Sequence, residues 1–221
     1  MKAIARIHTD FPNKFGIPRQ SGIIASLQGR IIFEPEYRNA EAVRGLEEFS
    51  HIWLIWEFSE AIRDNWSPTV RPPRLGGNVR KGVFATRSPF RPNPIGLSSV
   101  KLEGVEIDPK LGPILLVSGA DLMDGTPIYD IKPYIAYTDS HPDAVSGFAS
   151  KPAEYLLEVD FPEPLLQQVP ETLRENLVEV LAHDPRPQYH DDPERVYGMA
   201  FGGIEVKFMV DKTQLKVVDV K

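Results

Sequence analysis

Residues 49–58 read Phe-Ser-His-Ile-Trp-Leu-Ile-Trp-Glu-Phe, a run that is apolar at nearly every position. A short apolar run rich in β-branched and aromatic residues predicts a strand buried on both faces. Side chains alternate along a strand, so His51 and Trp53 would share one face. For His51 alone, a hydrogen-bonded structural role is a simpler interpretation than a catalytic one. Around this run, residues 46–137 contain no long helical pattern, which predicts an all-β main body of many short strands.

The segments on either side of this run also read as short strands separated by turn residues. The predicted strands are residues 3–8, 22–28, 30–34, 96–107 and 113–120, with one short helix over residues 40–46 that Asn39 would cap. In the segment that follows, Asp124-Gly125 is a strong turn signal, and a surface hairpin is the plain interpretation. Three aspartates, one lysine and two tyrosines within residues 121–134 favour a functional turn instead, because a surface hairpin does not need them.

The last third of the chain is different, because it contains the one persuasive helical periodicity. Polar and small residues over 138–152 predict a domain boundary. After a predicted strand over residues 154–161, an apolar stripe runs through residues 165–182, and Pro170 splits it so that residues 171–183 form the better helix. A terminal hairpin is predicted over residues 204–210 and 215–220. The expected organisation is a main β domain over residues 1–140 and a small α+β domain over residues 153–221.

Bulk composition excludes several classes of protein. The 221 residues are 42% apolar and 25% charged, which is ordinary for a globular protein. The absence of cysteine excludes disulfides, a cysteine nucleophile and cysteine-ligated metal sites. No apolar run is long enough to span a membrane, and the first residues lack the long apolar stretch of a signal peptide. A cytoplasmic location is therefore expected.

Residues 67–101 form a basic segment in an otherwise acidic chain. They contain seven lysines and arginines and no aspartate or glutamate, although the whole chain has a formal charge of −6. Six of the 21 prolines lie in the same segment, so it is partly ordered before it binds anything. A solvated, proline-rich surface loop is the alternative interpretation, but Phe84, Phe90 and Ile95 among the arginines weigh against it. The segment predicts a local site for an anionic or nucleic-acid partner.

Several common chemistries have no motif here. The sequence contains no phosphate-binding P-loop, no dinucleotide-binding glycine motif and no nucleophile elbow. The five histidines show no pair spaced for a metal, and His190-Asp191-Asp192 is compatible with a cation or, more simply, with an exposed polar turn. The residues alone therefore indicate a β-rich protein that binds an anionic or nucleotide-like ligand, without a metal.

Four segments, in order along residues 1–140, resemble the tRNA N6-threonylcarbamoyladenosine N6-methyltransferase family, whose members use S-adenosyl-L-methionine. The segments are Phe-Gly-Ile-Pro-Arg-Gln at residues 15–20, Gly-Leu-Glu-Glu-Phe-Ser-His-Ile-Trp at 45–53, the long basic segment at 71–98, and Asp-Gly-Thr-Pro with Asp-Ile-Lys-Pro-Tyr at 124–134. Residues 184–187 and 197–198 are similar to the smaller C-terminal region of many members. The resemblance implies a single antiparallel β-barrel and a homodimer with cofactor pockets at or near the subunit interface.

The same resemblance implies where the cofactor binds. The residues that would contact S-adenosyl-L-methionine are Pro18, Arg19, Gln20, His51, Arg87, Leu97, Asp124, Gly125, Thr126 and Pro127. Backbone groups at a glycine-containing turn can read an adenine edge, and an arginine can hold a carboxylate through two parallel hydrogen bonds. Aromatic faces or carboxylates can lie near a sulfonium cation. The division of these roles between Arg19 and Arg87 stays open at this point.

The resemblance also implies the reaction, the methylation of N6 of threonylcarbamoyladenosine beside the tRNA anticodon. The ureido nitrogen is a weak nucleophile while protonated, so a general base is expected, with Asp124, Asp130 and Tyr134 as candidates. Each could instead have a structural role. The tRNA would lie on Arg71, Arg74, Arg80, Lys81 and Arg91. Two alternatives remain: a non-catalytic module that binds S-adenosyl-L-methionine or RNA, and a barrel methyltransferase with another substrate.

Overall fold

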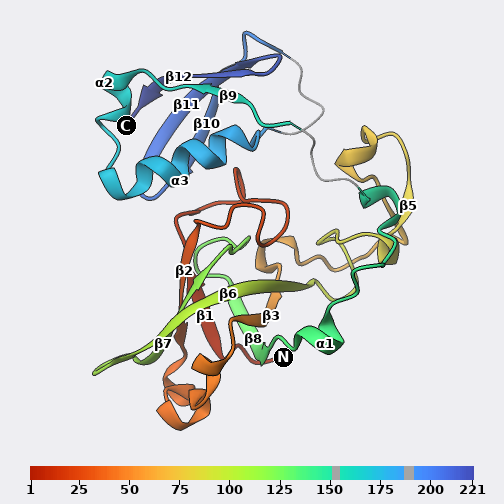
Figure 1. Cartoon of the computed structure of the whole chain (residues 1–221). Helices are drawn as coiled ribbons and strands as arrows, with labels where there is room; N and C mark the ends of the chain where they lie inside the picture. The colour runs from red at the N-terminus through yellow and green to blue at the C-terminus, as the bar shows by residue number, and fades with distance from the viewer. Residues whose placement is uncertain (151–154, 187–191) are drawn as a thin grey trace.

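The computed structural model describes residues 1–150, 155–186 and 192–221, so His190 and Asp191 lie outside the described residues. Six antiparallel strands close a barrel in the order β1-β2-β7-β6-β3-β8 (Figure 1). These strands are β1 Ala5–His8, β2 Gln28–Phe33, β3 His51–Glu57, β6 Ile95–Asp108, β7 Gly112–Ser118 and β8 Pro127–Pro133. The first and last of them complete the closure, because Ala5 of β1 pairs with Ile128 of β8. The predicted β-barrel is confirmed.

Strand β3 lies between β6 and β8 and shows why the apolar run at residues 49–58 forms part of a barrel. Ile52, Leu54 and Trp56 point into the barrel and are buried, whereas Trp53 and Ile55 on the other face are half-buried. The prediction that both faces are buried was wrong, because a closed barrel has one interior face and its exterior is covered only in part. The predicted sharing of one face by His51 and Trp53 is confirmed by the alternation.

The barrel connections contain short helical turns in place of the one predicted helix. Over residues 40–46 the chain forms 3₁₀ turns, although Asn39 does accept a hydrogen bond from the Glu41 amide at 3.0 Å. The 3₁₀ segments are Pro35–Tyr37, Ala40–Val43, Leu46–Glu48, Ser59–Ala61, Pro73–Leu75, Val83–Ala85 and Gly147–Ala149. In the basic segment, β4 Thr69–Val70 and β5 Lys81–Gly82 form a two-stranded sheet.

Two of the predicted elements of the barrel differ in the structure. Residues 22–27 are not a strand, and regular pairing begins only at Gln28. The physical reason is that Ile24 and Leu27 pack into the core of the C-terminal region instead of alternating on a sheet. The turn at Asp124-Gly125 is not a hairpin either, since β8 pairs with β1 and β3 and not with the preceding strand β7.

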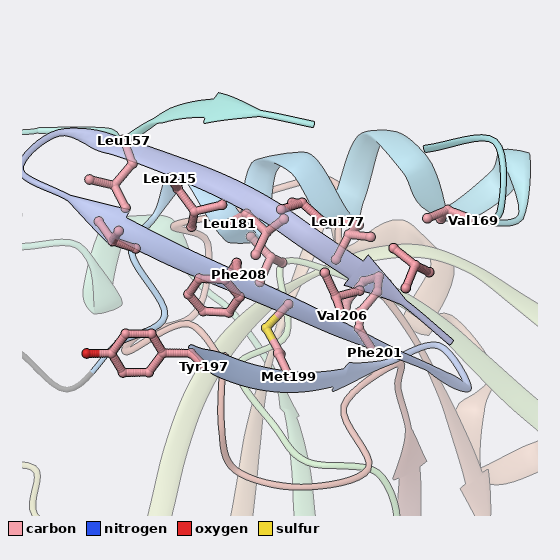
Figure 2. Packing of buried hydrophobic residues seen from close by; sticks show 14 of the residues in the cluster. Leu157, Val169, Leu177, Leu181, Tyr197, Met199, Phe201, Val206, Phe208 and Leu215 are labelled. Atoms are coloured by element: carbon pink, nitrogen blue, oxygen red, sulfur yellow. The ribbon is translucent and has the colours of Figure 1, made fainter. Parts of the chain in front are cut away.

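The C-terminal region packs a four-stranded sheet against a helix, as the predicted α+β class requires. The sheet has the order β10-β11-β12-β9, with β9 Glu158–Asp160, β10 Tyr197–Phe201, β11 Ile204–Asp211 and β12 Gln214–Val220. Helices α2 Glu163–Leu166 and α3 Glu171–Ala182 flank Pro170, so the predicted split is confirmed. Leu177 and Leu181 of α3 point toward Phe208 of the sheet (Figure 2). The terminal hairpin is confirmed, and β10 is an additional strand.

A short helix, α1 Ala136–Asp139, follows β8 at the end of the barrel domain. No helix among the described ranges 1–150, 155–186 and 192–221 is long and apolar enough to cross a membrane. The division into domains at residues 1–140 and 153–221 stays a prediction. The two hydrophobic cores do not follow this boundary completely, because residues of the β1–β2 connection belong to the C-terminal core.

Candidate active site

A cavity of about 530 Å³ opens where the basic segment, the β1–β2 connection and the ends of β3 and β6 meet. This volume lies in the range of cofactor and substrate sites, which is about 300–1,000 Å³. Segments far apart in the sequence contribute to it. The residues that line the cavity include Pro18, Arg19, Gln20, Trp56, Phe58, Arg87, Phe90, Arg91, Gly96, Leu97, Asp121 and Thr126.

A glycine opposite a tryptophan shapes one wall of the cavity. Gly96 pairs with Trp56 across strands β6 and β3, and a Cβ atom on Gly96 would lie only 2.2 Å from Cε2 of the indole. The ring therefore lies flat against the backbone of β6, where only glycine leaves room. Its other neighbour is Phe58, whose ring centroid is 4.2 Å away. Trp56 is 7% exposed and Phe58 is half-buried, so Phe58 with the edge of the indole forms an apolar wall against which a planar group can pack.

A hydrogen-bonded chain leads from this wall to a buried carboxylate. The Trp56 Nε1–H donates to Ser98 Oγ at 3.0 Å, and the Ser98 hydroxyl donates to Asp121 Oδ1 at 2.6 Å. Burial raises the pKa of the Asp121 carboxyl, while the Ser98 hydroxyl and the backbone amide of Ser21 work in the opposite direction. Asp121 thus joins the barrel wall to the β1–β2 connection at the cavity.

Charged groups of both signs surround the cavity. The guanidinium of Arg87 donates to Gln20 Oε1, which holds the basic segment against residues 18–20. Arg19 and Arg91 add positive charge, and Glu57, Glu60 and Asp121 add carboxylates. A ligand with one anionic and one cationic group, together with a planar ring, would find a complement for each part.

The turn at residues 123–127 reaches the cavity through Met123 and Thr126. Thr126 is buried, and its hydroxyl donates to the Met123 carbonyl at 2.7 Å. Gly125 adopts a left-handed φ of 75°, and its amide donates to the Ile7 carbonyl at 2.8 Å. Asp124 faces away toward β1, where His8 Nδ1 lies 3.1 Å from its carboxylate. The turn is thereby fastened to β1.

Of the ten residues predicted to contact the cofactor, six line the cavity: Pro18, Arg19, Gln20, Arg87, Leu97 and Thr126. The remaining four lie outside its lining. Asp124, Gly125 and Pro127 belong to the turn that carries Thr126, so they support the cavity from behind. His51 is exposed at the start of β3, where its Nδ1 lies 3.0 Å from Ser50 Oγ.

The three candidate bases are not gathered at one point. Asp124 is flanked by Met123 and Thr126 of the cavity. Tyr134 packs against Trp53, a further lining residue, with ring centroids 5.5 Å apart. The Asp130 carboxylate pairs with Lys132 Nζ at 2.8 Å on the partly exposed face of β8. The structure therefore places Tyr134 behind a cavity residue, turns the Asp124 carboxylate toward His8 and leaves Asp130 in an ion pair.

The basic side chains predicted to face RNA lie in the connection between β4 and β5, at the start of β5 and at the cavity. Arg71 and Arg74 are exposed, and Arg80 donates to Thr69 Oγ1 at 3.0 Å. Lys81 lies in β5 and is half-buried. Arg91 lines the cavity, and its Nη1 donates to the Thr86 carbonyl at 3.0 Å.

Exposed aromatic rings lie beside these cations. Phe84 is 72% exposed, and its ring centroid lies 6.1 Å from that of Trp66, which is 52% exposed. The Arg91 guanidinium carbon lies 6.0 Å from the Phe84 ring, and that of Arg63 lies 3.8 Å from the Phe90 ring. Rings and guanidinium groups side by side are the combination on which unstacked nucleobases stack.

Sequence reasoning missed the apolar wall and the buried acid. Trp56 and Phe58 read only as members of an apolar strand, because nothing local distinguishes a ring at a barrel end from one in its core. Asp121 was seen as one of three aspartates in residues 121–134, with no role assigned to it. Its position directly beyond the predicted strand at 113–120 was the available signal, since strand ends often carry functional side chains.

The fold and the cavity together define a class: a closed antiparallel barrel with a cavity, lined by groups of both charges, where a basic segment meets its rim. The chain matches the family described as "tRNA-methyltransferase O N-terminal domain" over residues 6–140 and the "TrmO C-terminal domain" over residues 154–221. These matches cover more than half of the chain, and the chain belongs to this family.

Individual relatives agree with this assignment. The chain is 42% identical over 223 residues to the tRNA (adenine(37)-N6)-methyltransferase of Escherichia coli (strain K12), which covers 97% of this chain and 94% of that protein. It is 49% identical to the protein of the same name from Eikenella corrodens, over 74% of this chain and 92% of that protein. A crystal structure of TrmO from Pseudomonas aeruginosa superimposes with a TM-score of 0.78 at 34% identity, over 99% and 97% of the two chains.

Proposed function

We propose that this protein is an S-adenosyl-L-methionine-dependent methyltransferase that methylates N6 of threonylcarbamoyladenosine beside the tRNA anticodon. The observation that carries the proposal is the convergence of Pro18, Arg19, Gln20, Arg87, Leu97 and Thr126 on one cavity. Family membership supports the reaction, and the names of the relatives place it at adenine 37 of tRNA. A relative from Pseudomonas aeruginosa, 41% identical, is named a putative S-adenosylmethionine-dependent methyltransferase, which supports the cofactor.

The residues present fit this cofactor. The guanidinium groups of Arg19 and Arg87 are suited to hold the methionyl carboxylate, and the carboxylates of Glu57, Glu60 and Asp121 are suited to the ammonium group. The rings of Trp56 and Phe58 can pack on the adenine or face the sulfonium. When bound, the cofactor supplies an electrophilic methyl group. Among the described residues, no group of histidine or carboxylate side chains is arranged to hold a metal ion.

The protein's own contribution is positioning followed by removal of a proton. A methyl transfer needs the nucleophile and the methyl carbon in line, so a rigid cavity wall lowers the entropic part of the barrier. Trp56 is held by Phe58 on one side and hydrogen-bonded to Ser98, which gives that rigidity. The N6–H of the acceptor needs a base, and we assign this role to Asp124, Asp130 or Tyr134. Tyr134 is the best placed of the three, since its ring packs against Trp53 of the lining, whereas the Asp124 carboxylate faces His8 and the Asp130 carboxylate pairs with Lys132.

The tRNA would lie across the basic segment. Arg71, Arg74, Arg80 and Lys81 would face phosphates, because the three arginines are exposed in the connection between β4 and β5, and Lys81 begins β5. The exposed rings of Phe84 and Trp66 would stack on bases of the anticodon loop, which is single-stranded and therefore has bases free to be splayed out. This arrangement leads a splayed adenosine toward Arg91 at the cavity.

The test is a methylation assay with purified protein, radiolabelled S-adenosyl-L-methionine and tRNA with or without the threonylcarbamoyl group. Only the modified tRNA should be methylated. Equal methylation of both would refute the substrate, and methylation of neither, with cofactor binding intact, would favour a binding module. In vivo, mass spectrometry of tRNA nucleosides should detect the N6-methylated threonylcarbamoyladenosine in cells that have the gene and not in cells that lack it.

A further inference from the structure

The core of the C-terminal domain includes side chains from the other end of the chain. Phe11, Ile24 and Leu27 of the β1–β2 connection are at most 2% exposed and belong to the same buried cluster as the sheet and helix α3. Phe15 and Ile17 pack against this cluster as well. In Figure 1 the red connection rises from the barrel toward the C-terminal sheet. Residues 9–27 therefore complete a core that residues 155–221 do not complete alone.

Specific contacts fasten both ends of this connection to the C-terminal domain. Near its start, the Phe11 ring meets Phe201 edge-on with centroids 5.2 Å apart, and the Gly202 amide donates to the Asp10 carbonyl at 2.8 Å. Near its end, the Ser26 hydroxyl donates to Glu179 Oε2 of helix α3 at 2.6 Å. The connection is thus held at two points that are separated by the cavity residues 18–20.

The segment between these two points has no regular structure of its own. Residues 9–27 form no strand or helix, so no ladder of backbone hydrogen bonds fixes their shape. The barrel side holds the segment by separate hydrogen bonds, such as the Gly22 amide to the Gly119 carbonyl at 2.8 Å and the Gly119 amide to the Leu27 carbonyl at 2.8 Å. Gly16 lies so close to Met199 of β10 that a Cβ atom would be 2.4 Å from its sulfur. Because Phe15 and Ile17 on one side of residues 18–20 and Ile24 on the other pack in the C-terminal core, the shape of residues 18–20 depends on the C-terminal domain as well as on the barrel.

We infer that the C-terminal domain positions the cofactor-binding segment Pro18-Arg19-Gln20, with Phe11 and Glu179 as positioning residues. The inference rests on the proposed function, because it takes the cavity to be the cofactor site. An irregular segment that is already ordered loses less entropy when a ligand binds. If this segment were ordered for only a fraction of the time, the apparent affinity for the ligand would be reduced to that fraction of its intrinsic value. Coupling of this kind is reciprocal, so the cofactor should also tighten the docking of the C-terminal domain.

The first experiment measures S-adenosyl-L-methionine affinity by calorimetry for the full-length protein and three variants. Phe11→Ala should weaken binding about tenfold, and Glu179→Ala about two- to tenfold, the equivalent of one net hydrogen bond. Glu175→Ala is the matched control, since Glu175 is exposed one turn earlier on the same helix, and it should bind like the wild type. At saturating cofactor, kcat should change less than twofold while KM for the cofactor rises, a split that simple loss of folded protein cannot produce.

The second experiment follows hydrogen exchange in the unmodified protein. Saturating S-adenosyl-L-methionine should slow exchange in residues 199–203, where the Gly202 amide bonds to the β1–β2 connection, and leave residues 209–216 of the distant hairpin unchanged. If Phe11→Ala fails to fold, the cofactor affinity of Glu179→Ala and the hydrogen-exchange data still test whether the C-terminal domain positions residues 18–20. Wild-type protein that does not bind the cofactor overturns the proposed function and this inference with it. Normal affinity in the variants, or exchange insensitive to the cofactor, overturns only the inference.

Discussion

Replacement of Gly96 with alanine tests the account of the cavity wall. Gly96 lies opposite Trp56, and an alanine methyl would approach three ring atoms, Cε2, Cζ2 and Cδ2, at 2.2, 2.4 and 2.6 Å. Ordinary contact begins near 3.4 Å. The indole would have to move by more than 1 Å, although it is only 7% exposed and is packed against Phe58. That movement also breaks the hydrogen bond from Trp56 to Ser98.

The expected cost combines two effects. Overpacking of a buried ring costs about 1–3 kcal/mol, and a buried hydrogen bond left without its donor costs about 1–3 kcal/mol. We expect Gly96→Ala to lower the free energy of unfolding by about 3 kcal/mol after the small gain in backbone entropy from alanine. For a chain of this size the loss corresponds to a decrease in Tm of roughly 6–12 °C. S-adenosyl-L-methionine binding should weaken too, because Trp56 lines the cavity.

The chain provides a control on the same strand. Gly104 also lies in β6, but a Cβ atom there would meet nothing within 4 Å. Gly104→Ala should therefore be neutral or stabilising by about 0.5–1 kcal/mol. The assay is urea unfolding monitored by tryptophan fluorescence, since all three tryptophans lie within residues 53–66 and report on the barrel. Equal stability of the two variants would refute the steric argument, and a destabilised Gly96→Ala protein that retains full cofactor affinity would show that Trp56 does not shape the cofactor site.

Three further predictions concern charge and assembly. Burial raises the pKa of Asp121 above 3.8, so the wild type should lose stability from this group as pH rises from about 4 through the raised value. Asp121→Asn should remove that loss, so the urea midpoint of the variant should rise relative to that of the wild type between pH 4 and 7. A difference between the two midpoints that does not change with pH would contradict the raised pKa of Asp121. Arg80→Ala should weaken tRNA binding and reduce the slope of log affinity against log salt by about one unit while cofactor affinity stays unchanged, whereas Arg87→Ala should reduce cofactor affinity. If the two variants have the same tRNA affinity by filter binding and the same cofactor affinity by calorimetry, Arg80 and Arg87 do not belong to separate sites for tRNA and cofactor. The protein should be a homodimer by light scattering, and a monomeric mass at micromolar concentration would argue against a shared pocket.

Local patterns identified the pieces of the fold whose physics is local. The short apolar run at residues 49–58, rich in β-branched and aromatic residues, predicts a strand whatever it pairs with, and the structure has β3 there. Pro170 interrupts a helix in any surroundings, since it lacks an amide hydrogen, and the structure has helices on both sides of it. The basic segment at residues 67–101 was visible for the same reason, as charge can be counted without knowing the fold.

Residues 22–28 show where local patterns fail. Ile24 and Leu27 suit a strand by composition, yet they are buried in a core formed by residues more than 130 positions later. Their burial is decided by docking, which no nearby residue signals. Asp121 is a similar case, because burial raises its pKa, and only the folded chain buries this carboxyl beside Ser98 and Ser21.

The sequence by itself determined most of the barrel strands and the helix after Pro170, where the positive charge lies, and, through resemblance, which motifs are predicted to form the cofactor site. Only the tertiary structure decided that six of the ten predicted cofactor residues share a cavity, that His51 is apart from it, and that Trp56, Phe58 and Asp121 complete it. The division has a physical cause. Backbone propensity and alternation act over a few residues, whereas a cavity depends on barrel closure, which brings strands distant in the sequence to one rim.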